Sequence, residues 1–164
     1  MCMVPKAARL LTAMFFCCFL YCSSAQAWEG VVVTVPDGDS LEVKQGDLVH
    51  KIRLYGIDCP EYGQASWIEA RGLTRAMALG QRVSVEPMDT DKYGRIVALV
   101  WSQGGQVNSE LVRKGQAWVY PRYCQKQPLC RDMNVLEQTA RAARLGLWHQ
   151  PNPTPPWSWR HSRP

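Results

Sequence analysis

Hydrophobic residues alternate with polar ones in five short segments of the chain, which is the pattern of half-buried β-strands. In the third segment Ile52 and Leu54 fall on one face, so that Arg53 lies on the face turned away from the core. The turn signal Pro-Asp-Gly-Asp at 36–39 separates the first two segments. The predicted strands cover residues 31–35, 40–44, 49–55, 82–86 and 96–101.

Three further segments repeat their hydrophobic positions with the period of a helix, at residues 65–79, 107–114 and 135–144. Gly115 predicts the end of the second helix, and Asn134, three residues before Glu137, predicts a cap at the start of the third. Five of the 14 residues in 151–164 are proline, which predicts an extended tail. This order of elements predicts an α+β fold: a five-stranded OB-fold Greek-key β-barrel with about three helices.

The N-terminal segment has the features of a secretory signal peptide. Lys6 and Arg9 precede the apolar run from Leu10 to Tyr21, and small residues at 25 and 27 predict cleavage after Ala27. The apolar run is too short for a membrane anchor, so we expect no stable membrane association after cleavage, and a secreted or periplasmic protein. The predicted divisions are a signal peptide at 1–27, a globular domain at 28–150 and a Pro/Trp-rich tail at 151–164.

The composition, 46% hydrophobic and 20% charged, is that of one ordinary globular domain and excludes a disordered, fibrous or coiled-coil protein. Loss of Lys6 and Arg9 with the signal peptide lowers the formal net charge from +5 to +3. This mild excess is compatible with a polyanionic partner but does not establish one. We expect the mature protein to be a monomer.

Cysteine and histidine spacing narrows the possible chemistry. Only three cysteines follow residue 27, in a chain expected to reach an oxidising compartment. Cys124 and Cys130 predict a disulfide because only a short loop separates them, and Cys59 would then be the reduced cysteine. No two of the three histidines have metal-ligand spacing, which argues against a zinc site. Any catalysis would therefore fall to carboxylates and arginines.

Polar residues gather in three segments at predicted strand ends: 37–40, 53–61 and 89–95. Asp39 and Asp58 offer the hard oxygen donors that Ca²⁺ prefers, to be completed by a backbone carbonyl and waters. Such a cation would draw a phosphate into a cluster of acids that otherwise repels it. Arg53 and Arg95 have the planar fork that binds phosphate oxygens in pairs. The sequence therefore predicts a phosphodiesterase site.

These segments resemble three motifs of the staphylococcal (micrococcal) nuclease family, in the family's order, within a match over roughly Val31 to Trp148. Asp-Gly-Asp-Ser at 37–40 is similar to the family's Asp-Gly-Asp-Thr. Arg53 with Asp58-Cys59-Pro60-Glu61 is similar to its Arg…Asp-Thr-Pro-Glu, and 91–95 reproduces Asp-Lys-Tyr-Gly-Arg. The resemblance implies a calcium-dependent endonuclease that hydrolyses DNA and RNA to 3′-phosphate-ended products on an OB-fold.

The resemblance also implies metal ligands, residues that act at the scissile phosphate, and residues that hold a neighbouring phosphate. The implied Ca²⁺ ligands are Asp39, Asp58 and the backbone carbonyl of Cys59. Arg53 and Arg95 would bind the scissile phosphate, and Glu61 would act on the attacking water as general base or as positioner. Lys92 and Tyr93 would hold the neighbouring phosphate.

The chain departs from the family pattern in several places. Cys59 stands where the best-known member has threonine, the loop after Glu61 is shorter, and the tail is an addition. The two tyrosines of the family's nucleotide pocket match only loosely, to Tyr120 and Tyr123. In the tail, Trp157 and Trp159 would pin the segment to the barrel or touch nucleic acid, and we favour pinning.

Two other classes of protein share part of this pattern. A non-catalytic OB-fold nucleic-acid-binding module would bind single strands without cutting them. An exported calcium-binding structural protein would need the acids but not the arginines. The presence together of Asp39, Asp58, Glu61, Arg53 and Arg95 favours the nuclease, because neither alternative needs the whole set.

Overall fold

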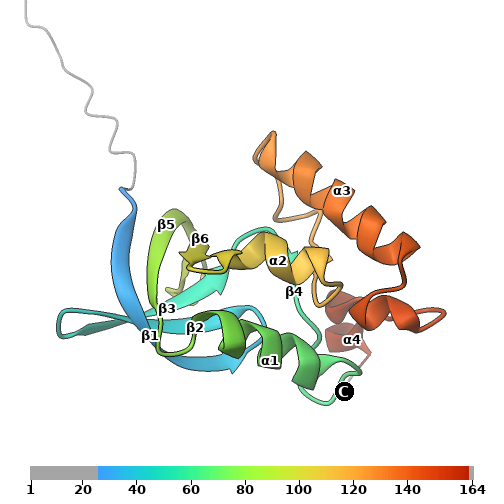
Figure 1. Cartoon of the computed structure of the whole chain (residues 1–164), viewed down its shortest axis with the longest axis horizontal. Coiled ribbons are helices and arrows are strands. Elements are labelled where there is room, and N and C mark those ends of the chain that lie inside the picture. The colour runs from blue at the N-terminus through green and yellow to red at the C-terminus, as the bar shows by residue number, and fades with distance from the viewer. Residues whose placement is uncertain (1–25, 163–164) are drawn as a thin grey trace, which may run out of the picture.

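The fold is a closed β-barrel with helices packed around it (Figure 1), seen in a computed structural model that describes residues 26–162. The signal-peptide prediction lies outside the described residues, apart from its last two. The barrel strands follow the order β3-β2-β1-β5-β6, and β3 also pairs with β6 in parallel, which closes the barrel. They are β1 (Trp28–Asp37), β2 (Ser40–Gln45), β3 (Leu48–Leu54), β5 (Arg82–Thr90) and β6 (Ile96–Ser102).

Side-chain alternation along these strands places the core inside the barrel, as the sequence predicts. Val43, Ile52, Leu54, Val85 and Ala98 are all 1% exposed or less. Two short pairings complete the sheets: β7 (Gly105–Gln106) pairs antiparallel with the end of β6, and β4 (Ile57–Asp58) pairs with β8 (Trp118–Val119). The predicted OB-fold α+β class is confirmed.

Strand β1 is longer than predicted, because the chain stays paired while it bends. Its partner changes along its length: Trp28 to Val31 pair with β5, and Val31 to Asp37 pair with β2. Register shifts interrupt the β1–β2 pairing on both sides of Thr34, and such shifts bend a strand. The bend carries the β1–β2 turn to the end of the barrel, where the polar segments meet.

A buried asparagine ties a helix to the seam that closes the barrel. Asn108 lies in α2 (Val107–Arg113) and is fully buried. Its amide nitrogen donates to the carbonyls of Tyr55 and Ala98, at 3.1 and 3.2 Å, and its amide oxygen accepts from the N–H of Val100 at 3.1 Å. One side chain thus satisfies backbone groups beside both β3 and β6.

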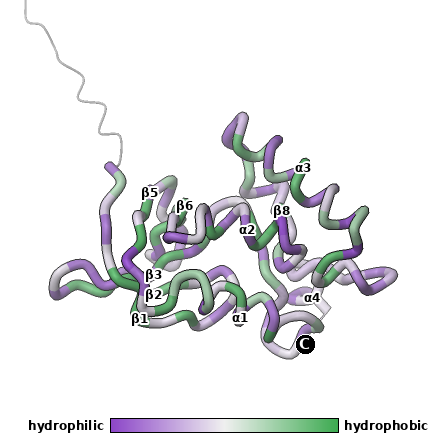
Figure 2. The backbone as a smooth tube through the Cα atoms, viewed as in Figure 1, coloured by the Kyte–Doolittle hydropathy of each residue, from purple (hydrophilic) through white to green (hydrophobic). Residues whose placement is uncertain are grey.

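The other helices follow the predicted order, with one wrong boundary. Helix α1 (Trp67–Ala78) lies within the predicted segment, whereas α3 (Leu129–Ala142) begins six residues earlier than expected. Asn134 is therefore not a cap; it lies inside α3 and donates to the carbonyl of Cys130. The buried positions of α3 recur at three- and four-residue spacing, and hydrophobic and hydrophilic stretches interchange along it in Figure 2. Its first turn, Leu129-Cys130-Arg131-Asp132, mixes apolar and charged residues, and the capping pattern at Asn134 and Glu137 indicates a later start.

The prediction of an extended tail is wrong. After a short 3₁₀ turn, η1 (Gly146–His149), the chain forms the helix α4 (Pro156–His161). Pro156 occupies the first turn, where a missing N–H and a fixed φ favour helix entry. Trp157 stacks on Tyr120 with centroids 4.6 Å apart and lies edge-on to Trp118 at 5.7 Å. These contacts fix the tail against β8.

Among residues 26–162, none of the helices combines the length and the apolar character that a membrane span requires.

We predict that Asn108→Ala lowers the free energy of unfolding by about 2 kcal/mol, because it leaves buried backbone groups at the β3–β6 seam without partners. Urea unfolding followed by tryptophan fluorescence measures the change, with Asn152→Ala, an exposed asparagine of the tail, as the matched control. Equal stability of the two variants would contradict the role of Asn108 as a tie across the seam.

Candidate active site

Two buried carboxylates share one guanidinium at the end of the barrel. Asp39 and Asp58 are 5% and 0% exposed. Arg53, at the end of β3, places Nη1 2.6 Å from Oδ2 of Asp39 and Nη2 2.7 Å from Oδ1 of Asp58. The alternation of β3 places Arg53 outside the hydrophobic core, yet its side chain is only 16% exposed. The structure thus brings three of the predicted site residues into direct contact.

Asp39 is held by a tight turn and a close backbone approach. Asp37 pairs with Ser40, which leaves Gly38 and Asp39 as the two turn residues between β1 and β2. A Cβ at Gly38 would lie 2.8 Å from Cβ of Cys59, so only glycine allows this approach. The N–H of Cys59 then donates to Oδ2 of Asp39 at 2.7 Å. Helix α1 supports the turn from beneath, where Thr74 donates to the carbonyl of Gly38 at 2.5 Å.

A third arginine, which the sequence analysis did not identify, reaches the same acids from the tail. Arg160 of α4 places Nη2 2.8 Å from Oδ2 of Asp58 and Nη1 3.3 Å from Oδ1, and Nη1 also bonds Oε1 of Glu61. Glu61 therefore joins the cluster through Arg160. No periodicity or motif marks Arg160, because the partners lie 102 and 99 residues away in the chain.

Burial and like charge raise the proton affinity of the acids here. Burial, followed by repulsion from Asp39, raises the pKa of Asp58 to about 6, although Arg160 and Arg53 act against this rise. Burial and the charge of Asp39 also raise the pKa of Asp37. Burial alone lowers the pKa of Arg53, but the charges of Asp39 and Asp58 outweigh it and raise that pKa. The site thus contains more carboxylates than guanidinium groups, and Arg53 and Arg160 hold those carboxylates close together.

The third predicted segment forms an ordered loop between β5 and β6. Asp91 accepts from the backbone N–H of Tyr93 and of Arg95, both at 2.9 Å, and its Oδ2 lies 2.7 Å from Nε of Arg95. The exposed ring of Tyr93 has Lys92 and Arg95 beside it, 5.0 and 5.7 Å from the centroid. Two cations and one aromatic side chain thus form a small basic surface.

Strand pairing relates this loop to the acidic cluster. Val97 is the parallel partner of Arg53, and Arg95 comes two residues before Val97. Arg95 directly precedes β6, so the loop that carries it leads into the strand that pairs with β3. Among the described residues, Arg53 and Arg160 form ion pairs with the acidic cluster, which is made of Asp39, Asp58 and Glu61. Arg95 forms its ion pair with Asp91 instead.

The donor set suits a hard cation, although in residues 26–162 no group of three or more His, Cys, Asp or Glu side chains is arranged to hold a metal ion. In the described residues, the carboxylates form ion pairs with two arginines. Asp39 and Asp58 converge on Arg53, and Asp58 and Glu61 converge on Arg160. Three carboxylates that converge on cationic groups offer the oxygen donors that Ca²⁺ prefers.

The cysteines and tyrosines lie as follows around the site. Cys124 is joined to Cys130 by a disulfide, with their Cα atoms 5.5 Å apart. Cys59 is a buried free thiol. Its pKa lies well above the normal value, chiefly because of burial and then because of the charge of Asp39. Tyr120 lies beneath Trp157, whereas Tyr123 is 55% exposed. Of the two tyrosines, Tyr123 is therefore the more exposed.

The fold and the site together define a class of protein: an OB-fold barrel with an acidic, arginine-rich site at one end, suited to phosphodiester chemistry. The family model described as "Staphylococcal nuclease homologue" matches residues 51–150. The matched region begins after Asp39 and includes Arg53, Asp58, Glu61 and Arg95.

Curated proteins agree with this match. An "Uncharacterized endonuclease" of Escherichia coli is 38% identical over 135 residues, which cover 82% of this chain and 86% of that protein. A "Micrococcal nuclease" of Shigella flexneri is 38% identical over 151 residues, covering 85% and 86%. A "Staphylococcal-like nuclease CAN1" of Arabidopsis thaliana is 35% identical over 113 residues, covering 69% of this chain and 34% of that one.

The chain belongs to the staphylococcal nuclease family. Its class of activity is hydrolysis of phosphodiester bonds as an endonuclease, and its substrate is nucleic acid. The family is one of metal-dependent enzymes, in agreement with the acidic cluster.

We predict that Arg53→Ala lowers the free energy of unfolding by about 3 kcal/mol, because two buried carboxylates lose their shared counter-charge. Urea unfolding at neutral pH measures the change. The matched control is Arg82→Ala, which removes an exposed arginine that lies 3.6 Å from Glu29, and should cost less than about 0.5 kcal/mol. A loss no larger than that of the control would show that Arg53 does not hold the acidic pair.

Proposed function

We propose that the protein is an exported calcium-dependent endonuclease that hydrolyses DNA and RNA to 3′-phosphate-ended products. The observation that carries this proposal is the convergence of Asp39 and Asp58 on one guanidinium, with Glu61 joined to the same cluster. A bound calcium ion would supply positive charge that draws the scissile phosphate toward these acids and polarises it. The proposed ligands are Asp39, Asp58 and the backbone carbonyl of Cys59.

Arg53 and Arg95 would hold the scissile phosphate and stabilise the charge that builds on its oxygens. A guanidinium has five N–H donors, more than the three contacts that Arg53 makes with Asp39 and Asp58. Those contacts fix the orientation of Arg53 before a substrate binds, which reduces the cost of ordering it. Arg95 is ordered by Asp91 in the loop that leads into β6, the strand that pairs with β3. Lys92 and Tyr93 would hold the neighbouring phosphate.

Glu61 would act on the attacking water. Its position suits that task because it lies in the loop after β4, beside Asp58, and is partly accessible. The water oxygen would form the new bond to phosphorus while the bond from phosphorus to the 5′ oxygen breaks. The water proton would pass to Glu61, directly or through solvent, and the 5′ oxygen would leave with a proton as a hydroxyl.

Export is supported by two features. The sequence begins with a segment that has signal-peptide character, and Cys124 and Cys130 form a disulfide, a bond that is typical of oxidising compartments. The alternative function, a non-catalytic nucleic-acid-binding module, accounts for the barrel but gives no role to Glu61. It also gives no role to the buried acids, which repel a phosphate backbone.

We predict that the purified protein degrades DNA and RNA when Ca²⁺ is added and stops when a chelator removes it, because the acids repel phosphate unless a divalent ion neutralises them. Digestion of single-stranded DNA, double-stranded DNA and RNA, with product ends identified by phosphatase treatment, measures this. Activity that survives a calcium chelator and requires Mg²⁺ instead would overturn the assignment of the ion.

We predict that Glu61→Gln and Arg95→Ala each lower kcat by about 10²- to 10³-fold, because each removes a group that acts in the transition state. The matched controls are Glu69→Gln, an exposed acid of α1, and Arg113→Ala, whose ion pair with Glu110 within one helix resembles that of Arg95 with Asp91. Circular dichroism and urea unfolding check that the fold is kept. Near-normal turnover in either active-site variant would refute its role.

A further inference from the structure

The guanidinium of Arg160, in the tail, lies against carboxylate oxygens near the proposed metal site. Arg160 grips both oxygens of Asp58 and also bonds Glu61, so these ligand oxygens are already engaged. We propose that Arg160 is a built-in counter-cation of the metal site, which must leave Asp58 before a divalent ion binds and which therefore sets the metal affinity. This inference rests on the proposed function, because it takes Asp58 as a ligand.

The two cations exclude one another by distance and by charge. A calcium ion lies about 2.3–2.6 Å from each ligand oxygen. The Nη2 atom of Arg160 lies 2.8 Å from Oδ2 of Asp58, so a calcium ion on that oxygen would stand beside a guanidinium of the same sign. Coordination by Asp58 thus requires Arg160 to move. Arg53 lies on Oδ1 and on Asp39, and it leaves Oδ2 of Asp58 to Arg160.

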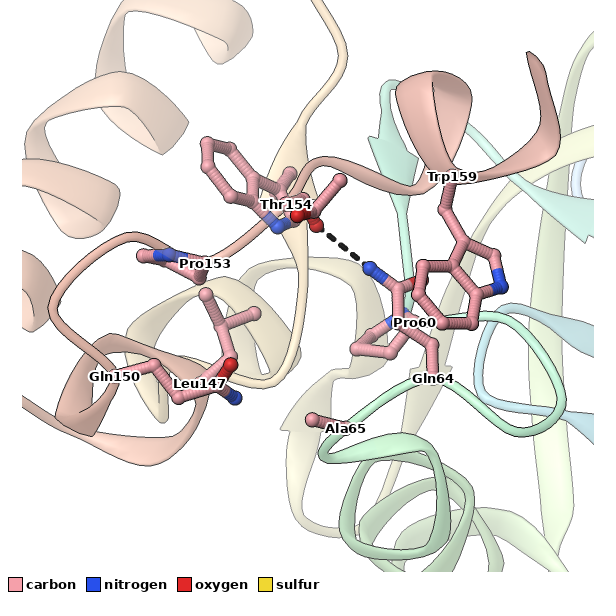
Figure 3. Close-up of a pocket in the computed structure, with 9 residues that line it drawn as sticks. Pro60, Gln64, Ala65, Leu147, Gln150, Pro153, Thr154 and Trp159 are labelled. Atoms are coloured by element: carbon pink, nitrogen blue, oxygen red, sulfur yellow. Dashed lines mark hydrogen bonds between the residues drawn. The ribbon is translucent and has the colours of Figure 1, made fainter. Parts of the chain in front are cut away.

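The tail is docked through contacts that do not involve Arg160. Trp157 stacks on Tyr120, Pro156 is buried, and Gln64 donates to the carbonyl of Thr154 at 2.6 Å. Figure 3 shows this hydrogen bond, with Trp159 directed from α4 toward Pro60 and Gln64 along the hollow between the tail and the loop after β4. In Figure 1 α4 accordingly lies beside the start of α1.

These anchors keep Arg160 near the site even when its ion pairs break. The side chain is 40% exposed and lies in the last turn of a six-residue helix, where opening costs little. Release therefore requires movement at the end of α4 and leaves Trp157 docked. A tethered cation of this kind competes at a high effective concentration. Arg160 can thus lower the metal affinity without blocking the site permanently.

The size of the effect follows from the fraction of molecules in which Arg160 is released. The apparent Kd for the metal equals the intrinsic Kd divided by that fraction. Removal of Arg160 makes the fraction one and lowers the apparent Kd. Because coupling is reciprocal, metal binding must in turn release the end of α4. The two effects are separately measurable, and neither needs a catalytic assay.

The test is calorimetric titration of Ca²⁺ alone into the wild-type protein, Arg160→Gln and a matched control, Arg131→Gln, whose exposed arginine pairs only with the adjacent Asp132. We expect Arg160→Gln to bind Ca²⁺ with a Kd about tenfold lower than wild type. Arg131→Gln, with the same loss of charge, should match wild type. We also expect hydrogen exchange at residues 156–162 of the wild type to rise when Ca²⁺ saturates it.

Each outcome of the titration bears on the inference. An unchanged Kd in Arg160→Gln, with Ca²⁺ bound by both proteins, would overturn the competition and leave the proposed nuclease site intact. A raised Kd would also overturn the competition, because it would mean that Arg160 helps to hold the ligands in place. Binding only in Arg160→Gln would support the inference strongly. Absence of binding in every variant would overturn the calcium site and the inference with it.

Discussion

Burial of like-charged carboxylates beside one another is the constraint on which the candidate site depends. Asp39 and Asp58 are almost wholly removed from solvent, and burial with mutual repulsion raises the pKa of Asp58. An isolated buried carboxylate would take up a proton, so the fold must bring positive charge to this place. Arg53 lies between the two acids and provides it. In the proposed function, the same excess of negative charge would attract a divalent cation.

The barrel satisfies this constraint by bringing distant segments to one end. The β1–β2 turn supplies Asp39, the end of β3 supplies Arg53, and β4 supplies Asp58. The parallel β3–β6 pairing closes the barrel and joins the strand of Arg53 to the strand that directly follows Arg95. Helix α1 supports the turn through Thr74, and α2 holds the seam through Asn108. Helices α1 and α2 thus contribute buried residues to the core and also fix the positions of polar groups at the site and the seam.

Much of this arrangement could be predicted from the sequence, because it depends on local patterns. Alternation at 49–55 predicts the inward Ile52 and Leu54 and the outward Arg53. Two of the three motifs at strand ends, 37–40 and 53–61, predict the cluster of Asp39, Asp58 and Arg53. The start of α3 and the helix α4 could not be predicted in this way. The first turn of α3 mixes apolar and charged residues, and Asn134 with Glu137 imitates a cap further along. The prolines of the tail favour an extended chain, and the contact of Trp157 with Tyr120 that accompanies α4 is not visible in the sequence.

Arg160 shows the limit of local reasoning most clearly. Its partners are about a hundred residues away, and its only local context is a Pro/Trp-rich tail with no periodicity. Arg160 contacts Asp58 and Glu61 because these acids attract positive charge once the fold has formed. No short segment of the sequence contains both the arginine and its partners. The tail therefore acts on the chemistry of the site through charge, and on the fold through the packing of Trp157.

The central claim is that Asp39 and Asp58 become a site for a divalent ion. Its most direct test is a crystal structure of the protein with saturating Ca²⁺, together with a second crystal soaked in Mn²⁺ to locate the ion by anomalous scattering. The account predicts one ion bound by a carboxylate oxygen of each aspartate, with Arg160 withdrawn from Asp58. Density that shows no ion, and both acids still bonded to Arg53 and Arg160, would contradict it.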